Sequence, residues 1–165
     1  MENFVYSIEA QRKGRNARSE RGRGTLLREE LHMLALKESS SRARPRLVLA
    51  HADSLYAALV RQIFLRLRWD VHVTSSGVRA RELAADLAPS LIILDTDLPD
   101  ESGWLTCAKL TQEHQDLQVI LVADRVGRTS HAFAYYVGAA ALIGRNDGLR
   151  ALVNQARDVA LCVAG

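Results

Sequence analysis

The sequence predicts an α/β domain built on a five-stranded, doubly wound parallel sheet with helices on both faces. Two observations carry this prediction. Short, continuous apolar runs recur along the chain, as expected for parallel strands that helices cover on both sides. Helical patterns fill the intervals between the runs, which is typical of right-handed βαβ units. The strands are expected at 46–50, 71–73, 91–94, 118–122 and 140–143, and the helices at about 54–68, 77–87, 103–114, 128–137 and 147–162.

The first 45 residues differ in composition from the rest of the chain. Residues 1–46 hold 11 Lys and Arg against 6 Asp and Glu, a net charge of +5, whereas residues 47–165 hold 11 against 13, a net charge of −2. The stretch 11–24 combines Arg, Gly and small polar residues with almost nothing to bury, so we expect it to be disordered. The sequence therefore predicts a basic, partly disordered extension over 1–45 and a folded domain over 46–165.

Within the extension, a short amphipathic helix is expected over 25–38. Thr25 can cap its first turn, and three leucines follow at helical spacing. Residues 39–45 are rich in Ser and Arg and form a linker. Pro45 ends the linker and opens the first strand of the folded domain.

Polar residues follow four of the five predicted strands. In doubly wound sheets, ligand chemistry gathers at the carboxyl ends of the strands. What the chain can do therefore depends on how these residues act together. They are His51-Ala52-Asp53 after the first strand, Asp95 after the third, Ala123-Asp124 after the fourth and Gly144-Arg145 after the fifth.

No motif of a known enzyme class accompanies these residues. Residues 50–54 follow the first strand without a G-x-G-x-x-G loop, and the chain contains neither a P-loop nor a G-x-S-x-G motif. Cys107 and Cys162 lie far apart, which argues against a disulfide framework or a zinc site. No apolar run approaches the roughly 20 residues needed to span a bilayer. We therefore expect a cytoplasmic protein that is not an enzyme and does not enter the membrane.

The segment Leu91-Ile-Ile-Leu-Asp95-Thr-Asp97-Leu-Pro99-Asp-Glu-Ser-Gly103 resembles the stretch around the phosphoacceptor in the receiver domain of two-component response regulators. In that family an apolar strand ends in the accepting Asp, and a Pro and a Gly follow at matching offsets. The resemblance places Asp95 at the phosphoacceptor position and Asp97 where a backbone carbonyl holds the metal. It extends over residues 46–162 and implies a flavodoxin-like, CheY-like fold with the strand order 2-1-3-4-5.

The other strand ends depart from the receiver pattern. Where the resemblance implies two adjacent acids that bind Mg²⁺, this chain has His51 and Ala52, and Asp53 is expected to cap the first helix. Ala123 stands where the family has Thr or Ser, and Arg145 where it has Lys. Hard oxygen ligands are lost, and an Arg fork does not replace a compact ammonium group. We therefore expect no bound Mg²⁺, no other cofactor and a silent phosphoacceptor position.

Two questions stay open around Asp95. In one reading, His51, Arg145 or both satisfy its carboxylate permanently by an ion pair that replaces the metal. In the other reading, His51 is partly exposed and has no partner. Three further acids of the same loop either hold a different metal together with Asp95 or are solvated or cap the next helix. They are Asp97, Asp100 and Glu101.

Two surface features predict partners. The fourth helix carries Tyr135 and Tyr136, and their spacing suits either a contact with a protein partner or packing in the core. The resemblance implies an interaction face formed by the fourth helix, fifth strand and fifth helix, which can also serve a homodimer. In the extension, six basic residues either contact nucleic acid or only raise solubility. They are Arg12, Lys13, Arg15, Arg18, Arg21 and Arg23.

The leading hypothesis is a stand-alone, atypical receiver, a pseudo-receiver that acts as a protein-interaction module in bacterial signal transduction independently of phosphorylation. Its expected partner is a signalling protein or sensor kinase. One alternative is a conventional phosphorelay receiver that is phosphorylated on Asp95. Another is a nucleic-acid-associated protein that binds through the Arg-rich tail.

Overall fold

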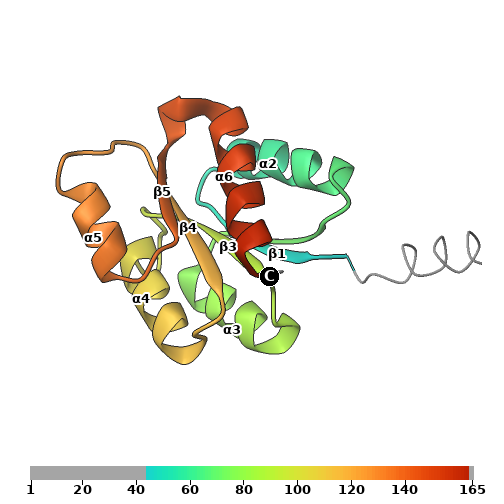
Figure 1. The fold of residues 1–165 in the computed structure, drawn as a ribbon, viewed down its shortest axis with the longest axis horizontal. Coiled ribbons are helices and arrows are strands. Elements are labelled where there is room, and N and C mark those ends of the chain that lie inside the picture. The colour runs from blue at the N-terminus through green and yellow to red at the C-terminus, as the bar shows by residue number, and fades with distance from the viewer. Residues whose placement is uncertain (1–43, 164–165) are drawn as a thin grey trace, which may run out of the picture. The chain divides into compact units, whose positions relative to one another are not determined.

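Five parallel strands alternate with helices, as predicted (Figure 1). A computed structural model describes residues 44–163, so the predicted extension and its helix over 25–38 lie outside the described residues. The strands are β1 (Arg46–Ala50), β2 (Asp70–Thr74), β3 (Leu91–Asp95), β4 (Gln118–Ala123) and β5 (Ala141–Gly144). The helices are α2 (Ser54–Arg66), α3 (Gly77–Leu87), α4 (Gly103–Glu113), α5 (Ser130–Tyr136) and α6 (Gly148–Val163), and a 3₁₀ turn, η1 (Arg145–Asp147), precedes α6.

The sheet has the order β2-β1-β3-β4-β5, and every neighbouring pair is parallel. This order confirms the flavodoxin-like fold class that the sequence predicts. The register brings the carboxyl ends of β1, β3, β4 and β5 level, because Ala50 pairs with Leu94, Asp95 with Val122 and Ala123 with Gly144. The residues that follow these strands therefore meet at one edge of the sheet.

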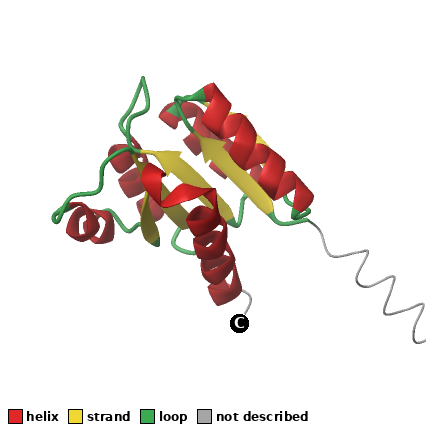
Figure 2. Cartoon of the chain, turned by 90° about the horizontal axis from the view of Figure 1, so that it is seen from above, coloured by secondary structure: helices red, strands yellow, loops and turns green. Residues whose placement is uncertain are grey.

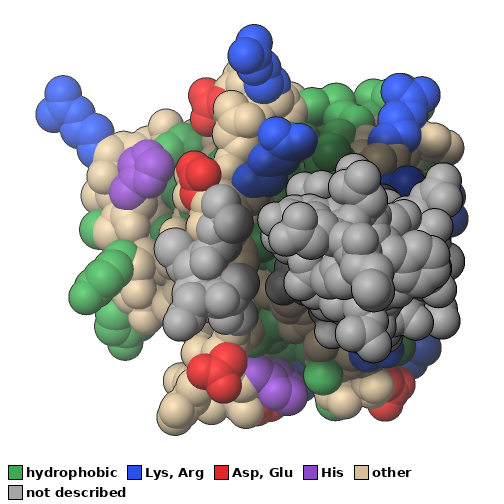
Figure 3. All heavy atoms as spheres, turned by 45° about the vertical axis from the view of Figure 1, so that its right-hand side comes forward, with side chains coloured by type: hydrophobic (Ala, Val, Ile, Leu, Met, Phe, Trp, Pro, Cys, Tyr) green, Lys and Arg blue, Asp and Glu red, His purple; other side chains and the backbone are tan. Residues whose placement is uncertain are grey.

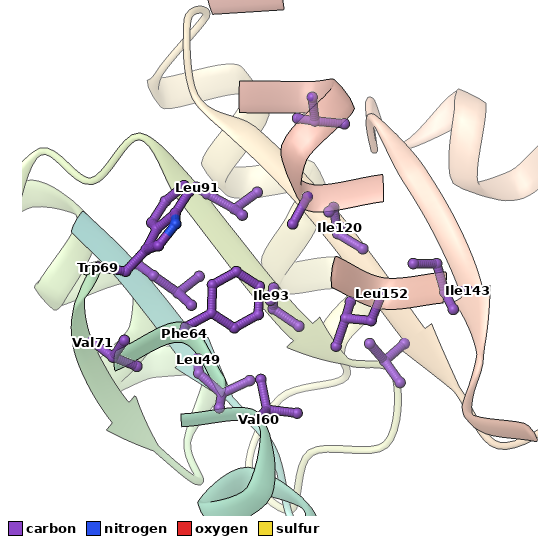
Figure 4. Packing of buried hydrophobic residues seen from close by; sticks show 14 of the residues in the cluster. Leu49, Val60, Phe64, Trp69, Val71, Leu91, Ile93, Ile120, Ile143 and Leu152 are labelled. Carbon is purple, nitrogen blue, oxygen red and sulfur yellow. The ribbon is translucent and has the colours of Figure 1, made fainter. Parts of the chain in front are cut away.

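Helices cover both faces of the sheet (Figure 2). Because successive side chains of a strand point to opposite faces, each strand contributes to two cores. In β1, Leu47 and Leu49 join the core beneath α2 and α6, whereas Val48 and Ala50 join the core beneath α3, α4 and α5. Figure 4 shows the first core, where Phe64 of α2 lies over the strands. The continuous apolar runs are thus explained by burial on two sides.

Local backbone signals set the ends of the helices. Asp53, Ser76 and Ser102 cap α2, α3 and α4, because their side chains accept hydrogen bonds from backbone N–H groups of the first turns. The structure thus confirms the predicted capping role of Asp53. Helix α2 ends at Arg66, two residues earlier than predicted, and Arg68 then takes a left-handed φ of 65°.

The fourth helix and fifth strand differ most from the prediction. Helix α5 begins at Ser130 rather than 128, and Thr129 before it makes no side-chain capping bond. After α5, Gly138 has a φ of 78°, which turns the chain toward β5 at Ala141 rather than 140. Within residues 44–163, no helix combines the length and the apolar character needed to cross a membrane.

Candidate functional site

Asp95 is the last residue of β3 and is only 9% exposed. Its two carboxylate oxygens accept hydrogen bonds from backbone N–H groups: Oδ2 from Ala52, at 3.1 Å, and Oδ1 from Asp97, at 3.0 Å. These donors belong to the loops that follow β1 and β3. Hydrogen bonds from backbone N–H groups stabilise an ionised carboxylate. The acid is therefore satisfied by the chain's own backbone.

His51 lies beside Asp95 and is 3% exposed. Its Nδ1 atom is 3.4 Å from Oδ2 of Asp95, so the predicted proximity of the two residues is confirmed. The same Nδ1 accepts a hydrogen bond of 3.0 Å from the backbone N–H of Asp53, and a nitrogen that accepts in this way carries no proton. Burial lowers the pKa of His51 and outweighs the opposite effect of Asp95. The lowered pKa and the accepting Nδ1 both favour a neutral imidazole, which argues against a permanent charged pair with Asp95. The other reading, a partly exposed His51 without a partner, is wrong.

Arg145, at the end of β5, contacts acids other than Asp95. Its guanidinium donates to the Asp53 carboxylate and, over 3.2 Å, to Oδ1 of Asp124. Of the two residues that could satisfy the Asp95 carboxylate, Arg145 does not contact it, so that part of the hypothesis is wrong. The physical reason is the cap of α2, because Asp53 is held there by the backbone N–H groups of Leu55 and Tyr56 and presents its other oxygen to Arg145. These backbone bonds, together with Arg145, hold the pKa of Asp53 below its ordinary value.

Tyr56 completes the mouth of the site and is missing from the sequence-based prediction. Its ring lies 4.5 Å from the His51 ring between centroids, tilted by 31°. On the same tyrosine, the guanidinium carbon of Arg145 lies 4.9 Å from the ring centroid, within the range of a cation–π contact. An aromatic residue in the first turn after the cap residue Asp53 is the sequence signal that could have indicated this position.

The remaining strand end carries a methyl group. Ala123 is buried and offers no hydroxyl toward Asp95. The hydroxyl of Thr96 is turned elsewhere, because it donates to Oδ2 of Asp97 at 3.1 Å. A hollow of about 340 Å³ opens beside these residues. It is lined by Thr96, Asp97, Trp104, Ala123, Asp124, Arg125 and Ser130.

Asp100, in the loop after β3, binds the start of α3. It accepts hydrogen bonds from the Ser76 hydroxyl, at 2.7 Å, and from the backbone N–H groups of Gly77 and Val78. These bonds hold the pKa of Asp100 well below its ordinary value. The expected alternatives were solvation or a cap on the next helix, α4. Asp100 is exposed, as expected for a solvated acid, but the helix that it binds is the preceding one, α3, because α3 and α4 pack side by side.

Glu101 ties α3 and α4 together in the same way. Its carboxylate accepts from the Thr106 hydroxyl at 2.9 Å, pairs with Lys109, and lies 3.4 Å from Nε of Arg81. Burial opposes ionisation here, but the bonds from Lys109 and Thr106 hold the pKa of Glu101 below its ordinary value. Gly103 closes the loop, because a Cβ atom at this position would lie 2.0 Å from the carbonyl oxygen of Asp95.

These side chains do not fit a magnesium ion. Within residues 44–163, no three His, Cys, Asp or Glu side chains are grouped so that they could hold a metal. Mg²⁺ requires near-octahedral oxygen ligation. At the end of β1 an imidazole and a methyl group stand beside Asp95, while Asp100 and Glu101 are directed to the helices.

The predicted partner residues lie on α5. Tyr135 is 87% exposed and Tyr136 is 83% exposed, so neither packs in the core. Helix α5 packs mainly against β5, and its Phe133 also reaches α4, where Trp104 lies 5.0 Å away between ring centroids. The basic residues predicted to contact nucleic acid, Arg12 to Arg23, lie outside the described residues.

Comparison with known proteins gives a consistent result. Residues 48–157 match the family described as the response regulator receiver domain. The TorCAD operon transcriptional regulatory protein TorR of Escherichia coli (strain K12) is 28% identical over 113 residues, which make up 68% of this chain and 49% of that protein. TorR of Escherichia coli O157:H7 matches to the same extent. The chain therefore spans about half the length of the curated relatives it matches.

Solved structures share the fold. The CheY-like receiver domain protein of Methanospirillum hungatei JF-1 superposes with a TM-score of 0.70 at 17% identity, covering 74% of this chain and 98% of that chain. The BeF3-activated N-terminal receiver domain of Klebsiella pneumoniae RstA superposes with a TM-score of 0.65 at 23% identity, covering 70% and 97%. At these identities the likeness concerns the fold alone.

Proposed function

Because the chain belongs to the response regulator receiver family, we propose that its receiver domain acts as a protein-interaction module of two-component signalling without phosphorylation of Asp95. The position of Arg145 carries this proposal. It stands where the family has Lys, and its guanidinium is bound to Asp53 and Asp124. The cation that would meet an incoming phosphoryl group is thus already neutralised.

The requirements of phosphoryl transfer support this reading. Transfer to a carboxylate needs positive charge around the equatorial oxygens, which a divalent metal and a lysine supply. Here His51 and Ala52 provide no hard oxygen ligand next to Asp95. Both oxygens of Asp95 accept backbone hydrogen bonds, which lowers their nucleophilicity.

The residues that would report phosphorylation are also changed. In the family, a hydroxyl at the end of the fourth strand turns toward the phosphoryl group, and an aromatic residue on the fifth strand follows it. Ala123 and Leu142 occupy these positions and have neither group. A binding surface that is always presented fits this arrangement better than one that is switched.

The proposal is tested by incubating the full chain with acetyl phosphate and Mg²⁺ and measuring the intact mass. We expect no phosphoryl adduct, whereas a conventional receiver treated in parallel gains one. A stoichiometric adduct that is lost in Asp95→Ala would instead establish a conventional phosphorelay receiver. The variant distinguishes phosphorylation of Asp95 from modification elsewhere.

The proposal includes a signalling protein or sensor kinase as the partner and the cytoplasm as the place of action. Receivers of this family act by contacts with kinases and other proteins, which supports a protein partner. The buried Cys107 is a free thiol, which suits a reducing compartment.

A further inference from the structure

An aromatic surface runs along the boundary between α4 and α5. Trp104 of α4 and Phe133 of α5 lie 5.0 Å apart between ring centroids, and Phe133 stacks on Tyr136 at 6.3 Å with an interplanar angle of 11°. We call these three residues the aromatic ridge. The two helices lie next to one another in Figure 1, joined to the same face of the sheet.

Helix geometry separates the ridge from the other exposed tyrosine. Residues advance by 100° around a helix, so Phe133 and Tyr136 lie 60° apart and share one side of α5. Tyr135 lies about 160° from Phe133, on the opposite side. Ala134 and Val137 face the core. The ridge therefore lies on the side of α5 that faces α4. This side differs from the interaction face of α5, β5 and α6 that the family resemblance implies.

The ridge is incompletely covered by the domain. Phe133 is 47% exposed, and Leu105, the residue after Trp104 on α4, is 50% exposed. The ridge borders the hollow of about 340 Å³, because its member Trp104 also lines that hollow. Exposed aromatic groups next to a hollow are typical of protein-binding sites, where a partner's apolar side chain enters the hollow.

Basic residues precede and begin α5, at one end of the ridge. Residues 125–146 contain no acid; Arg125 and Arg128 lie in the loop before α5, and His131 lies in its first turn. Within residues 44–163 neither Arg125 nor Arg128 forms a salt bridge, whereas the acid before them, Asp124, is paired. Figure 3 shows basic, histidine and hydrophobic side chains following one another along the margin of the molecule where α5 lies. The one exposed acid that lines the hollow without a basic partner is Asp97.

We propose that the aromatic ridge docks an amphipathic segment of a partner protein, with acids facing Arg125 and Arg128 and an apolar anchor in the hollow. Charge complementarity of this kind sets specificity and register. A protein is favoured over nucleic acid because residues 47–165 carry a net charge of −2 and Phe133 already stacks on its neighbours. The inference rests on the proposed role in protein interaction, but it does not depend on whether Asp95 is phosphorylated.

The test selects a phage-displayed library of 16-residue peptides on the full chain and measures binding of the enriched peptides by titration. We expect enriched sequences that combine Asp or Glu with Leu, Phe or Trp. Tyr136→Ala should weaken binding about tenfold, as for an aromatic hot-spot residue, because it removes part of the ridge. The matched control is Tyr135→Ala, a residue of the same type and exposure on the other side of the helix.

The outcomes separate the surface from the function. Peptides that bind equally to Tyr135→Ala and Tyr136→Ala would overturn the ridge but leave a protein-binding module. Basic peptides, preferential binding of an oligonucleotide to the ridge, or a dimer in solution that Tyr136→Ala abolishes would each overturn the acidic partner. If no peptide is enriched, the ridge is contradicted as a docking site for a partner segment, whereas the proposed role in protein interaction is left standing. Arg128→Glu should weaken binding of acidic peptides, whereas Arg157→Glu on α6 should leave it unchanged.

Discussion

Around Asp95, the loop that follows β3 and the ends of β1 and β5 are stabilised by different partners. In the loop, Asp100 and Glu101 bind the helices α3 and α4. At the strand ends, His51 and Arg145 both contact Asp53, His51 through the Asp53 backbone N–H and Arg145 through the Asp53 carboxylate. The fold itself uses the side chains of the loop, whereas the contacts at the strand ends join only residues around the mouth of the site. A similar loop therefore indicates the fold more strongly than the reaction.

The largest expected effect comes from restoring the strand ends. The combined variant His51→Asp, Ala52→Asp, Ala123→Thr and Arg145→Lys returns two oxygen ligands, a hydroxyl and a compact cation. We expect Mg²⁺ affinity to rise about 100-fold, taking about tenfold for each added carboxylate. Calorimetric titration measures the change, and Asp95→Asn in the same background should remove most of the gain. A folded variant whose Mg²⁺ affinity equals that of the wild type would show that the strand ends do not limit Mg²⁺ binding.

The next effect tests the loop. Gly103→Ala should destabilise the domain by about 3 kcal/mol, since its Cβ atom would lie 2.0 Å from the Asp95 carbonyl oxygen and both are backbone-fixed. Urea unfolding measures the loss. Gly127→Ala is the control, because its Cβ would meet the nearest atom at 3.6 Å, an ordinary contact. Equal stability of the two variants would mean that the loop adapts freely.

A smaller effect concerns the tie between α3 and α4. Glu101→Gln leaves Lys109 and Arg81 without their carboxylate, and we expect a loss of about 2 kcal/mol, because a largely buried charge partner is removed. The same urea experiment applies. Glu82→Gln breaks an exposed i,i+3 pair with Arg79 and should change stability by less than about 0.5 kcal/mol. If both variants behave alike, Glu101 does not hold the loop.

The smallest effect concerns His51. Its folded-state pKa lies below the ordinary 6.5, so the unfolded chain binds a proton on this group more readily than the folded one. The contribution of neutral His51 is therefore complete above about pH 6.5 and is lost as the pH falls toward the folded-state pKa. Unfolding measured from pH 8 to pH 5 should show a shallower decline in His51→Gln than in the wild type. An NMR titration that finds a raised pKa for His51 would contradict the neutral imidazole.

The fold was predictable because strands that are buried on both faces consist of continuous apolar runs in the sequence. Leu47, Val48 and Leu49 are all fully buried, and a strand covered on both faces gives such a continuous run. The cap at Asp53 was predictable for a similar reason, since it depends on residues one turn away. Local sequence thus determines which residues are strands and where α2 begins.

The contacts of the site were less predictable, because they join distant parts of the chain. Arg145 and Asp53 are 92 positions apart, and nothing local shows that the cap residue also presents an oxygen to β5. The same holds for Asp100, which lies next to α4 in sequence but binds α3 in space. Side-chain direction at a strand end follows from three-dimensional neighbours rather than from the residue type.

The pairing of Arg145 with Asp53 and Asp124 affects the order in which substitutions can accumulate. Removing this arginine alone would leave Asp53, Asp124 and Asp95 around one opening with no cation among them, and adding an acid at position 51 first would crowd it further. Like charges at such distances repel. Exchanging the residues at these strand ends one at a time is therefore opposed by the charges already in place, and several coordinated exchanges are needed.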